Sequence, residues 1–402
     1  MDLISSDLSR AEAGAALTAR DAVVSAVTAF SADLFGALAS SSTTNLVCSP
    51  YSVAVALGMT VQGAAGATAT QILAVLHSRD AAVLAEGLNE IDLALVPRSK
   101  AASGSAGDNA QPVELSSANS LWGQLDVTWQ QPFLDVLARD FGTGMRVVDY
   151  GRAEAARAEV NAWVSEQTRA RVPELIPAGV FDASTRLTLA NALYLKAPWR
   201  TPFQSGMTRE SPFHRLDGST VTTSLMHAPT GNRFATGPGW TAVDLPYAGG
   251  RLAMAVVVPD TGRFAEVEKA LTGEWLSRLL AGFRPAPVRV GLPRWTIRTQ
   301  AGLSEILAGL GMPAAFTDAA DFSAMTSQQP LKISAVVHEG FIAVDEAGTE
   351  AAAATAAVMM LTSAVLAPPR SVIADRPFVY IIHDRPTSTP LFIGRVLDPT
   401  ST

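Results

Sequence analysis

The chain has few charges, a single cysteine and no long uninterrupted apolar run. Only 17% of its 402 residues are Asp, Glu, Lys or Arg and 48% are hydrophobic, which excludes an intrinsically disordered chain. Because Cys48 is the only cysteine, no internal disulfide and no cysteine-based metal site is expected. No apolar run approaches the roughly 18 to 20 residues that span a bilayer, so no membrane partner is expected.

Clustered positive charge is also missing. The formal net charge is −7, and no stretch gathers four or more Lys and Arg residues. Nucleic acids and heparin-like polyanions are therefore not expected as partners. The first part of the chain, MDLISSDLSRAEAGAALTAR, lacks a basic segment followed by a continuous apolar one. We therefore expect no signal peptide, and a location in the cytoplasm or secretion by a non-classical route.

The sequence motifs of common enzymes are absent as well. We find no GxSxG, HExxH, P-loop or GxGxxG pattern. Scattered histidines are usually structural, and the histidines here lie far apart, at His77, His214, His227, His338 and His383. No catalytic activity, metal or cofactor is expected, and a hydrolase that uses one of these histidines is the alternative from another functional class.

Periodicity indicates helices in the first half of the chain and mainly strands in the second. One helix is predicted from Asp21, whose side chain can cap it, and others from Ser49-Pro50, over 131–141 and over 154–167. A small polar stretch at 100–111 is interpreted as a surface loop. From Thr185 on, short runs rich in β-branched residues predict strands. Helices over 264–280 and 301–310 interrupt these strands, and SVIADRPFVYIIHD with TPLFIGRV predicts a final hairpin. The pattern is typical of an α+β fold in one domain.

The segment 350–361, EAAAATAAVMML, carries conflicting signals. Its alanines favour a helix. However, it follows the strand-like run AVVHEGFIAVDEAG, and at a period of two it has one small, uncharged face, made of Thr349, Ala351, Ala353, Thr355 and Ala357. Such a strip could slide between two strands without the roughly 1–3 kcal/mol that overpacking costs. On this pattern alone, both a helix and an inserting strand remain open.

The same segment and several others resemble the serpin family. GTEAAAATA, preceded by Asp345 and Glu346, is similar to the proximal hinge of inhibitory serpins. Further resemblance lies in NLVCSPYSVAVALGMTVQGAAGATATQI, SANSLWG, NAWVSEQTRARVPELIP, TRLTLANALYLKAPW, LPRW, GLGMPAAF with DFSAM, HEGFIAVDEAGTE, DRPFVYIIHD and PLFIGRV. These stretches follow the family's order over about residues 21–398.

The resemblance implies one α+β domain over 21–398, with eight or nine helices, three β-sheets and an exposed reactive-centre loop at about 347–376. Residues 1–20 would then be an N-terminal extension and 399–402 a C-terminal tail. The implied fold is metastable, because the cleaved loop of a serpin inserts as a new strand into the central sheet. We expect a monomer of the bacterial or other intracellular kind, similar to clade B.

Site residues also follow from the resemblance. The implied hinge comprises Glu346, Gly348, Thr349, Glu350, Ala351, Ala352, Ala353, Ala354 and Thr355. In this family the middle strands of the central sheet can separate and leave a gap. The resemblance implies a polar cluster beneath that gap at Ser49, Ser52, Asn191 and His338, and it places Trp199 at the top of the gap. Without the resemblance, the four polar residues would be interpreted, in the same order, as a helix cap, part of a helix surface, a buried strand amide and a core histidine.

The implied function is that of a suicide inhibitor of serine proteases. By the family's usual count the scissile bond is Thr362-Ser363, which favours an elastase-like or subtilisin-like target because Thr362 is small and β-branched. If the count along the loop shifts, the residue before the scissile bond would be Leu361, which would suit a chymotrypsin-like enzyme, or Met360 as a third option. A cysteine protease target also stays open. The alternative is a non-inhibitory serpin that carries a ligand or acts as a chaperone, although its hinge would commonly contain bulky, charged or proline residues.

Overall fold

The computed structural model describes residues 2–14, 16–95, 113–228, 232–350 and 370–401. Within these ranges there are nine α-helices and three β-sheets, which confirms the predicted α+β class. The helices are α1 (Leu17–Ser40), α2 (Pro50–Val61), α3 (Gly66–Val75), α4 (Ala81–Leu95), α5 (Gln131–Phe141), α6 (Ala153–Gln167), α7 (Phe264–Lys269), α8 (Gly273–Gly282) and α9 (Ser304–Leu310). Short 3-10 turns lie at Tyr150–Arg152, Ser205–Met207 and Pro313–Phe316.

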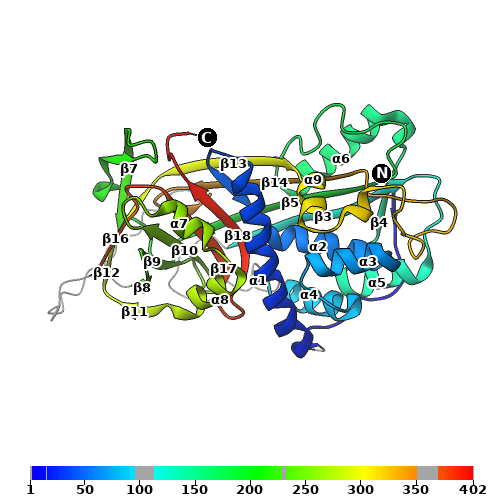
Figure 1. Ribbon diagram of the computed structural model, residues 1–402, viewed down its shortest axis with the longest axis horizontal. Coiled ribbons are helices and arrows are strands. Elements are labelled where there is room, and N and C mark those ends of the chain that lie inside the picture. Colours follow the sequence, from blue (N-terminus) through cyan, green and yellow to red (C-terminus); the bar gives the residue numbers. More distant parts are fainter. Residues whose placement is uncertain (1, 15, 96–112, 229–231, 351–369, 402) are drawn as a thin grey trace.

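The central sheet runs along the molecule, and its strands lie in the order β1-β4-β3-β5-β15-β14-β13 (Figure 1). These strands are β1 (Asp2–Ile4), β3 (Glu114–Gln124), β4 (Met145–Val148), β5 (Leu187–Pro198), β13 (Trp295–Gly302), β14 (Ala335–Val344) and β15 (Gly348–Thr349). Strand β5 is buried over almost its whole length, as expected for a strand covered on both faces.

Two further sheets complete the fold. The second sheet has the order β11-β8-β9-β10-β17-β18-β2 and the third has the order β16-β12-β7-β6. Their strands are β2 (Leu46–Cys48), β6 (Arg209–His214), β7 (Thr220–Ala228), β8 (Asn232–Gly237), β9 (Trp240–Pro246), β10 (Leu252–Pro259), β11 (Arg284–Ala286), β12 (Val288–Pro293), β16 (Arg370–Ile373), β17 (Phe378–Asp384) and β18 (Thr389–Val396).

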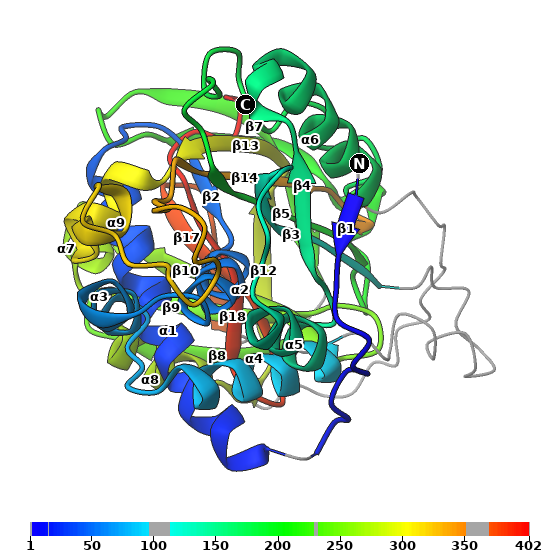
Figure 2. The same ribbon diagram turned by 90° about the vertical axis from the view of Figure 1, so that its right-hand side faces the viewer.

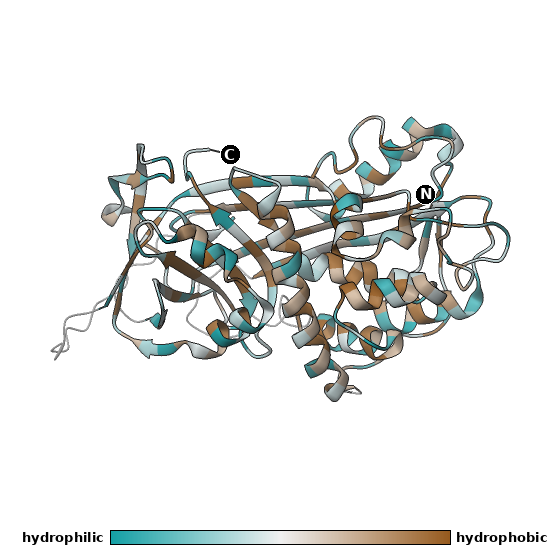
Figure 3. Ribbon diagram, viewed as in Figure 1, coloured by the Kyte–Doolittle hydropathy of each residue, from teal (hydrophilic) through white to brown (hydrophobic). Residues whose placement is uncertain are grey.

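Hydrophobic packing covers both faces of the central sheet. On the outer face, α6 packs against the sheet, with the rings of Trp122 and Trp163 5.6 Å apart and nearly perpendicular. The inner face lies over α2 and the second sheet, as the turned view shows (Figure 2). Brown, hydrophobic residues are concentrated in α2 and β10, which are buried along nearly their whole length (Figure 3). The sheet is therefore held from both sides.

The first helix differs from the sequence-based expectation. It begins at Leu17 instead of Asp21, and no side chain caps it locally. The buried carboxylate of Glu90 in α4 accepts hydrogen bonds from the backbone amides of Gly14 and Ala16 just before the helix. A residue distant in sequence therefore satisfies the amides at this end, which no local capping pattern reveals.

Helix α1 is also long and apolar enough to cross a membrane by length and composition, although charged residues interrupt its sequence. In the fold, 61% of its most apolar stretch is buried inside the protein. It packs against α2, α4, α8 and β18. We therefore interpret it as a core helix.

Three other predicted boundaries are wrong. The helix predicted over 264–280 is split into α7 and α8, because Thr272 caps α8 by accepting a hydrogen bond from the Trp275 amide. Helix α9 begins at Ser304, since Ala301 and Gly302 still belong to strand β13. The run SVIADRPFVYIIHD forms two strands in different sheets, β16 and β17, and only β17 makes the predicted hairpin with β18.

The segment expected as an N-terminal extension packs against the domain. Residues Asp2–Ile4 form β1 at the edge of the central sheet, paired with β4. Arg10 donates to Asn89 and Asp92 of α4 at 2.8 Å each. Residues 2–14 therefore contact both the edge of the central sheet and α4.

Candidate functional site

Four polar residues named from the sequence meet beneath the central sheet. His338 lies on β14, Asn191 on β5, Ser52 on α2, and Ser49 at the cap of α2, where its side chain accepts from the Ser52 amide. All four are fully buried. Because buried polar groups are costly unless they are hydrogen-bonded, their contacts determine whether the cluster is stable.

A hydrogen-bond chain joins the cluster. The Ser49 amide donates to His338 Nε2 at 3.0 Å, so the ring proton is assigned to Nδ1, which donates to Asn191 Oδ1 at 2.5 Å. The Asn191 amide in turn donates to Ser52 Oγ at 2.8 Å. Burial lowers the pKa of His338 to about 4, so the imidazole is neutral at physiological pH. The histidine therefore acts as a neutral link between α2 and two strands.

Asn119 on β3 completes this cluster, and we did not single it out from the sequence. Its Oδ1 accepts from both Ser52 Oγ and Asn191 Nδ2, each at 2.5 Å. In the strand register, Asn119 lies opposite Asn191, which lies opposite His338. Three neighbouring strands thus contribute one polar residue each to a single row. The motif SANSLWG contains Asn119, but only the register shows that this residue joins the row.

Strands β5 and β14 are parallel neighbours that separate at one end. They pair directly from Thr188 with Ala335 to Leu193 with Gly340. Above this point the two-residue strand β15 lies between them: Gly348 pairs with Pro198, and Thr349 pairs with Ala197 on one side and Val344 on the other. Gly348 and Thr349 of the predicted hinge are therefore already part of the sheet.

Gly348 is required where the hinge joins the sheet. A Cβ at this position would lie 2.2 Å from the Ala197 carbonyl oxygen and 2.6 Å from Pro198 Cα. Because both neighbours are backbone atoms of β5, a side chain could be accommodated only by displacing that strand. The glycine lets the hinge approach β5 closely.

Aromatic side chains hold the top of the gap. The rings of Trp199 and Tyr247 stack with centroids 4.6 Å apart and an interplanar angle of 4°. Trp199 Nε1 donates to the Asp345 carbonyl at 3.0 Å, and the Tyr247 hydroxyl lies 2.7 Å from Thr349 Oγ1. Burial raises the pKa of Tyr247, so the phenol stays protonated. The sequence pointed to Trp199, but nothing in it distinguished Tyr247.

An ion pair holds the hinge residue Glu346 against the domain. Glu346 forms a bidentate pair with Arg294, with contacts of 2.6–3.0 Å, and also accepts from Thr208 Oγ1 at 2.5 Å. Burial tends to raise the pKa of Glu346, but the hydrogen bonds from Arg294 and Thr208 outweigh it and lower the pKa overall. Glu346 therefore stays ionised and tied to the domain.

Glu350 points to the outer face of the sheet, where it pairs with Arg171 at 3.0 Å. Its side chain is only 6% exposed, and its backbone has a φ of 50°, a left-handed conformation that is uncommon for residues other than glycine. Burial, and next the Glu350 carboxylate, raise the pKa of Tyr194 to about 12. The strand geometry of β15 therefore ends at Glu350.

Residues 168–176, which follow α6 and which we call the crossing segment, lie over the outer face of the sheet. Arg169 pairs with Glu114 of β3, and the Arg171 carbonyl accepts from Arg298 of β13 at 2.9 Å. The Leu175 carbonyl accepts from Gln300 of β13 at 3.0 Å. The crossing segment thus contacts strands on both sides of the β5–β14 pair.

Two predictions lie outside the described residues. They are the remaining hinge residues, Ala351 to Thr355, and the reactive bond with its alternatives, Met360 to Ser363. Among the residues that are described, no group of three or more His, Cys, Asp or Glu side chains could hold a metal ion.

Comparisons with known proteins agree with this arrangement. The family model described as "Serpin (serine protease inhibitor)" matches residues 25–399. An uncharacterized serpin-like protein of Thermococcus kodakarensis is 35% identical and covers 94% of this chain and 86% of its own, and leukocyte elastase inhibitor of Bos taurus is 34% identical, covering 92% and 98%.

Solved structures show the same fold. The thermophilic serpin tengpin in its native state matches with a TM-score of 0.83 and 26% identity, covering 98% of this chain and 97% of its own. Thyroxine-binding globulin in complex with thyroxine matches with a TM-score of 0.81 and 25% identity, covering 94% and 99%. On the extent of the family match and of the aligned relatives, this chain belongs to the serpin family.

Proposed function

We propose that this protein inhibits serine proteases by a suicide mechanism in which its cleaved loop inserts into the central sheet. One observation carries the proposal: β15 already lies between β5 and β14, directly above the stretch where these two strands pair with each other. A chain that continues from Thr349 along this line would separate the two strands and pair with both.

The protease would supply the chemistry. Its nucleophile would attack the Thr362 carbonyl, form an acyl-enzyme and release the chain from Ser363 onward. The freed end could then enter the sheet, with each inserted residue gaining backbone hydrogen bonds that contribute about 1 kcal/mol net apiece. The attached protease would be carried along, and a small displacement of its nucleophile from the oxyanion hole stalls deacylation.

The polar cluster would control how readily β5 and β14 part. Separating them breaks the contact between His338 and Asn191, which lie on opposite sides of the gap. Because both side chains are buried, each must find a new partner before the inserted state is stable. If the hinge enters as a strand, the small residues at alternate positions after the buried Thr349 would form one uncharged face.

The relatives support a serine protease as the target. Leukocyte elastase inhibitors of several vertebrates are 32–34% identical to this chain. Together with the small Thr362, this favours an elastase-like or subtilisin-like enzyme over a trypsin-like one, whose pocket takes Lys or Arg. Cleavage at Leu361 would indicate a chymotrypsin-like target instead.

The test is to incubate the protein with a panel of elastase-like, subtilisin-like, chymotrypsin-like and cysteine proteases. A covalent complex that survives SDS, together with a released peptide whose mass shows that it begins at Ser363, would support both the mechanism and the predicted scissile bond. A peptide that begins at another residue would move the scissile bond to that position. Cleavage by every enzyme without any SDS-stable complex would refute the inhibitory function.

A further inference from the structure

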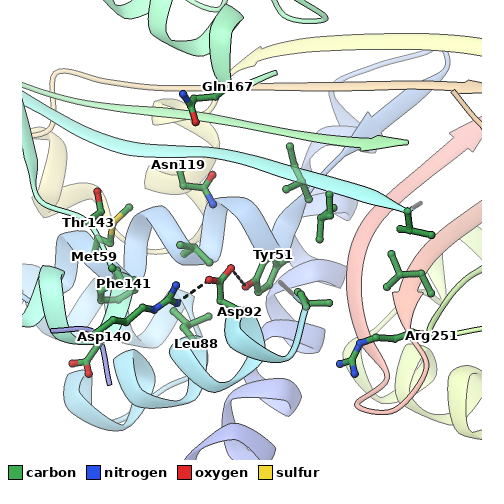
Figure 4. Close-up of a pocket in the computed structure, with 18 of the residues that line it drawn as sticks. Tyr51, Met59, Leu88, Asp92, Asn119, Asp140, Phe141, Thr143, Gln167 and Arg251 are labelled. Carbon is green, nitrogen blue, oxygen red and sulfur yellow. Dashed lines mark hydrogen bonds and ion pairs between the residues drawn. The ribbon is translucent and has the colours of Figure 1, made fainter. Parts of the chain in front are cut away.

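Most of the arginines that the structure describes are paired with a carboxylate. Asp92, which Figure 4 shows in the wall of a cavity lined by β3, α2 and α4, is paired with Arg10 at 2.8 Å. Three exposed arginines have no such partner among the described residues, and they lie on short strands of two sheets. They are Arg284, Arg289 and Arg370, and we call them the arginine surface.

The three strands that carry the arginine surface lie at one end of the molecule. Arg284 opens β11, Arg370 opens β16, and Arg289 is the second residue of β12. Strands β12 and β16 are parallel neighbours, with Arg370 opposite Val288 and Arg289 opposite Ser371. Figure 1 shows β11, β12 and β16 at the end that lies away from the N-terminus. A partner that approaches this end would therefore meet all three strands.

Phe234 on β8 connects two members of the arginine surface. Its backbone pairs with that of Arg284, and the guanidinium of Arg370 lies 4.6 Å from the centroid of its ring. Arg284 Nη1 donates to the carbonyls of Ala281 and Phe283 at 2.8 and 2.9 Å. An aromatic face and backbone carbonyls hold these side chains in place without neutralising their charge. The positive charge therefore stays available to a partner.

The carboxylates nearest to the arginine surface along the chain already have partners. Glu274, the last one before β11, is paired with Arg278 at 3.4 Å. Asp375, the first one after the start of β16, is paired with Arg376 at 2.8 Å. Asp244 on β9, in the sheet that contains β11, is completely buried. A counter-charge for the arginine surface therefore has to come from another molecule.

The arginine surface adjoins the end of the segment that contains the predicted scissile bond. Arg370 is the eighth residue after Thr362. Eight residues of fully extended chain span at most about 29 Å. A protease domain of about 220 residues has a radius of gyration of about 17 Å and is therefore roughly 40 Å across. The body of a protease bound at Thr362-Ser363 would thus be within reach of Arg370, on the side of its cleft that binds the residues after the scissile bond.

We propose that Arg284, Arg289 and Arg370 form a docking surface for an acidic region of the target protease, next to its active-site cleft. This proposal rests on the proposed inhibitory function. Complementary charges on two proteins speed their encounter, by about tenfold or more at low salt. A polyanion such as heparin would gain less here, because its affinity grows with the number of cations that it contacts and only three are present.

The arginine surface would act on the encounter and not on the trapped complex. After cleavage the protease stays bonded to Thr362, whereas Arg370 remains on the other side of the cut. Loop insertion would then carry the protease away from the arginine surface. We therefore expect these arginines to set the rate of capture and to leave unchanged the fraction of captured protease that ends in a covalent complex.

The first test measures how fast the SDS-stable complex forms with subtilisin whose lysines have been succinylated, which replaces cations by carboxylates. Arg289→Gln with Arg370→Gln is the surface variant. Arg79→Gln with Arg152→Gln is the control variant, which removes two exposed arginines from other parts of the fold and has the same net charge. At about 25 mM salt, where the Debye length is about 20 Å, we expect the surface variant to be at least about fivefold slower than the control variant.

Salt and side-chain shape provide further checks of this rate. At about 0.5 M salt the Debye length is only about 4 Å, and the rates of the two variants should converge. Arg289→Lys with Arg370→Lys keeps both charges and should retain most of the wild-type rate. Equal rates for the surface and control variants at low salt would overturn the proposal. A difference that persists undiminished at high salt would also overturn it.

A second test separates docking from inhibition. Succinylated subtilisin whose nucleophilic serine is replaced by alanine can dock but cannot form an acyl-enzyme. We expect the surface variant to bind it at least about fivefold more weakly than the control variant does at low salt, and equal affinities would overturn the docking surface. If this difference is found but the wild type forms no SDS-stable complex with any protease, the proposed inhibitory function is refuted and the docking surface stands.

Binding to heparin-agarose tests the other class of partner. We expect neither variant to be retained at about 0.15 M salt. Retention of the control variant but not of the surface variant, together with equal affinities for the inactive subtilisin, would overturn the proposal and assign the arginine surface to a polyanion.

Discussion

The hydroxyl of Tyr247 lies 2.7 Å from that of Thr349, and this contact anchors the hinge residue Thr349 between β5 and β14. Both side chains are buried, Thr349 with only 1% of its surface exposed. The hinge therefore starts from a position inside the sheet, and the insertion that we propose extends a strand that already exists. This anchoring leads to the first prediction.

Tyr247→Phe removes one hydroxyl and leaves that of Thr349 buried without its partner. We expect the native protein to lose roughly 1–3 kcal/mol in its free energy of unfolding, the usual cost of an unsatisfied buried group. The measurement is equilibrium unfolding in urea. Adding Thr349→Val should recover most of the loss, because the second polar group is then absent too; losses that simply add would show that the two hydroxyls are not coupled.

Thr349→Arg should convert the inhibitor into a substrate. Thr349 occupies a buried position between two strands, and burying a guanidinium there would carry a large desolvation cost. The loop would still be cut, but the acyl-enzyme would hydrolyse before insertion. An SDS gel should show cleaved protein and almost no covalent complex, whereas Thr349→Ser, the small control, should retain the complex. Undiminished trapping by Thr349→Arg would contradict insertion through this position.

The ion pair between Arg171 and Glu350 should stabilise the hinge in its present position. Arg171→Ala would leave the nearly buried Glu350 carboxylate without its counter-charge, and we expect a loss of about 1 kcal/mol, since the half-exposed Arg171 is screened by solvent. Thermal unfolding of the intact protein measures this change. The double variant Arg171→Ala with Glu350→Gln should be more stable than Arg171→Ala alone, and Arg278→Ala, which breaks an exposed helical pair, is the control.

Stability should fall in mild acid because of His338. Burial lowers its pKa from 6.5 in the unfolded chain to about 4 in the folded protein. Below pH 6.5 the unfolded state therefore binds more protons than the folded state, and stability rises with pH between about 4 and 6.5. The slope should approach 1.4 kcal/mol per pH unit and the total roughly 3 kcal/mol. Urea unfolding across this range should show that His338→Gln loses this part of the slope; an unchanged slope would assign the acid sensitivity to other groups.

The sequence carried the fold class and much of the site because its strand patterns and motifs are continuous in the chain. Ser49, Ser52, Asn191 and His338 were named from motifs, and the structure brings all four into one hydrogen-bond chain. Asn119 was not singled out, because its membership depends on how three strands align. Tyr247 was missed because its role depends on a stacking partner that is distant in sequence.

Helix boundaries show the same limit. Local capping rules placed the start of the first helix at Asp21, whereas Glu90 on another helix satisfies the amides that precede Leu17. The left-handed backbone of Glu350 was equally invisible, and so was its pairing with Arg171, because the pair depends on the crossing segment packed over the sheet. Pattern therefore predicts elements, and tertiary contacts decide where they end.

The central claim is that the cleaved loop inserts between β5 and β14, and the most direct measurement compares thermal unfolding before and after the loop is cut. The protein should be cleaved within residues 351–369 by a protease that it does not trap, and its unfolding midpoint compared with that of the intact chain. The account predicts a clearly higher midpoint for the cleaved form, because the inserted strand adds hydrogen bonds on both sides. An unchanged or lower midpoint would contradict insertion and favour a serpin that does not inhibit.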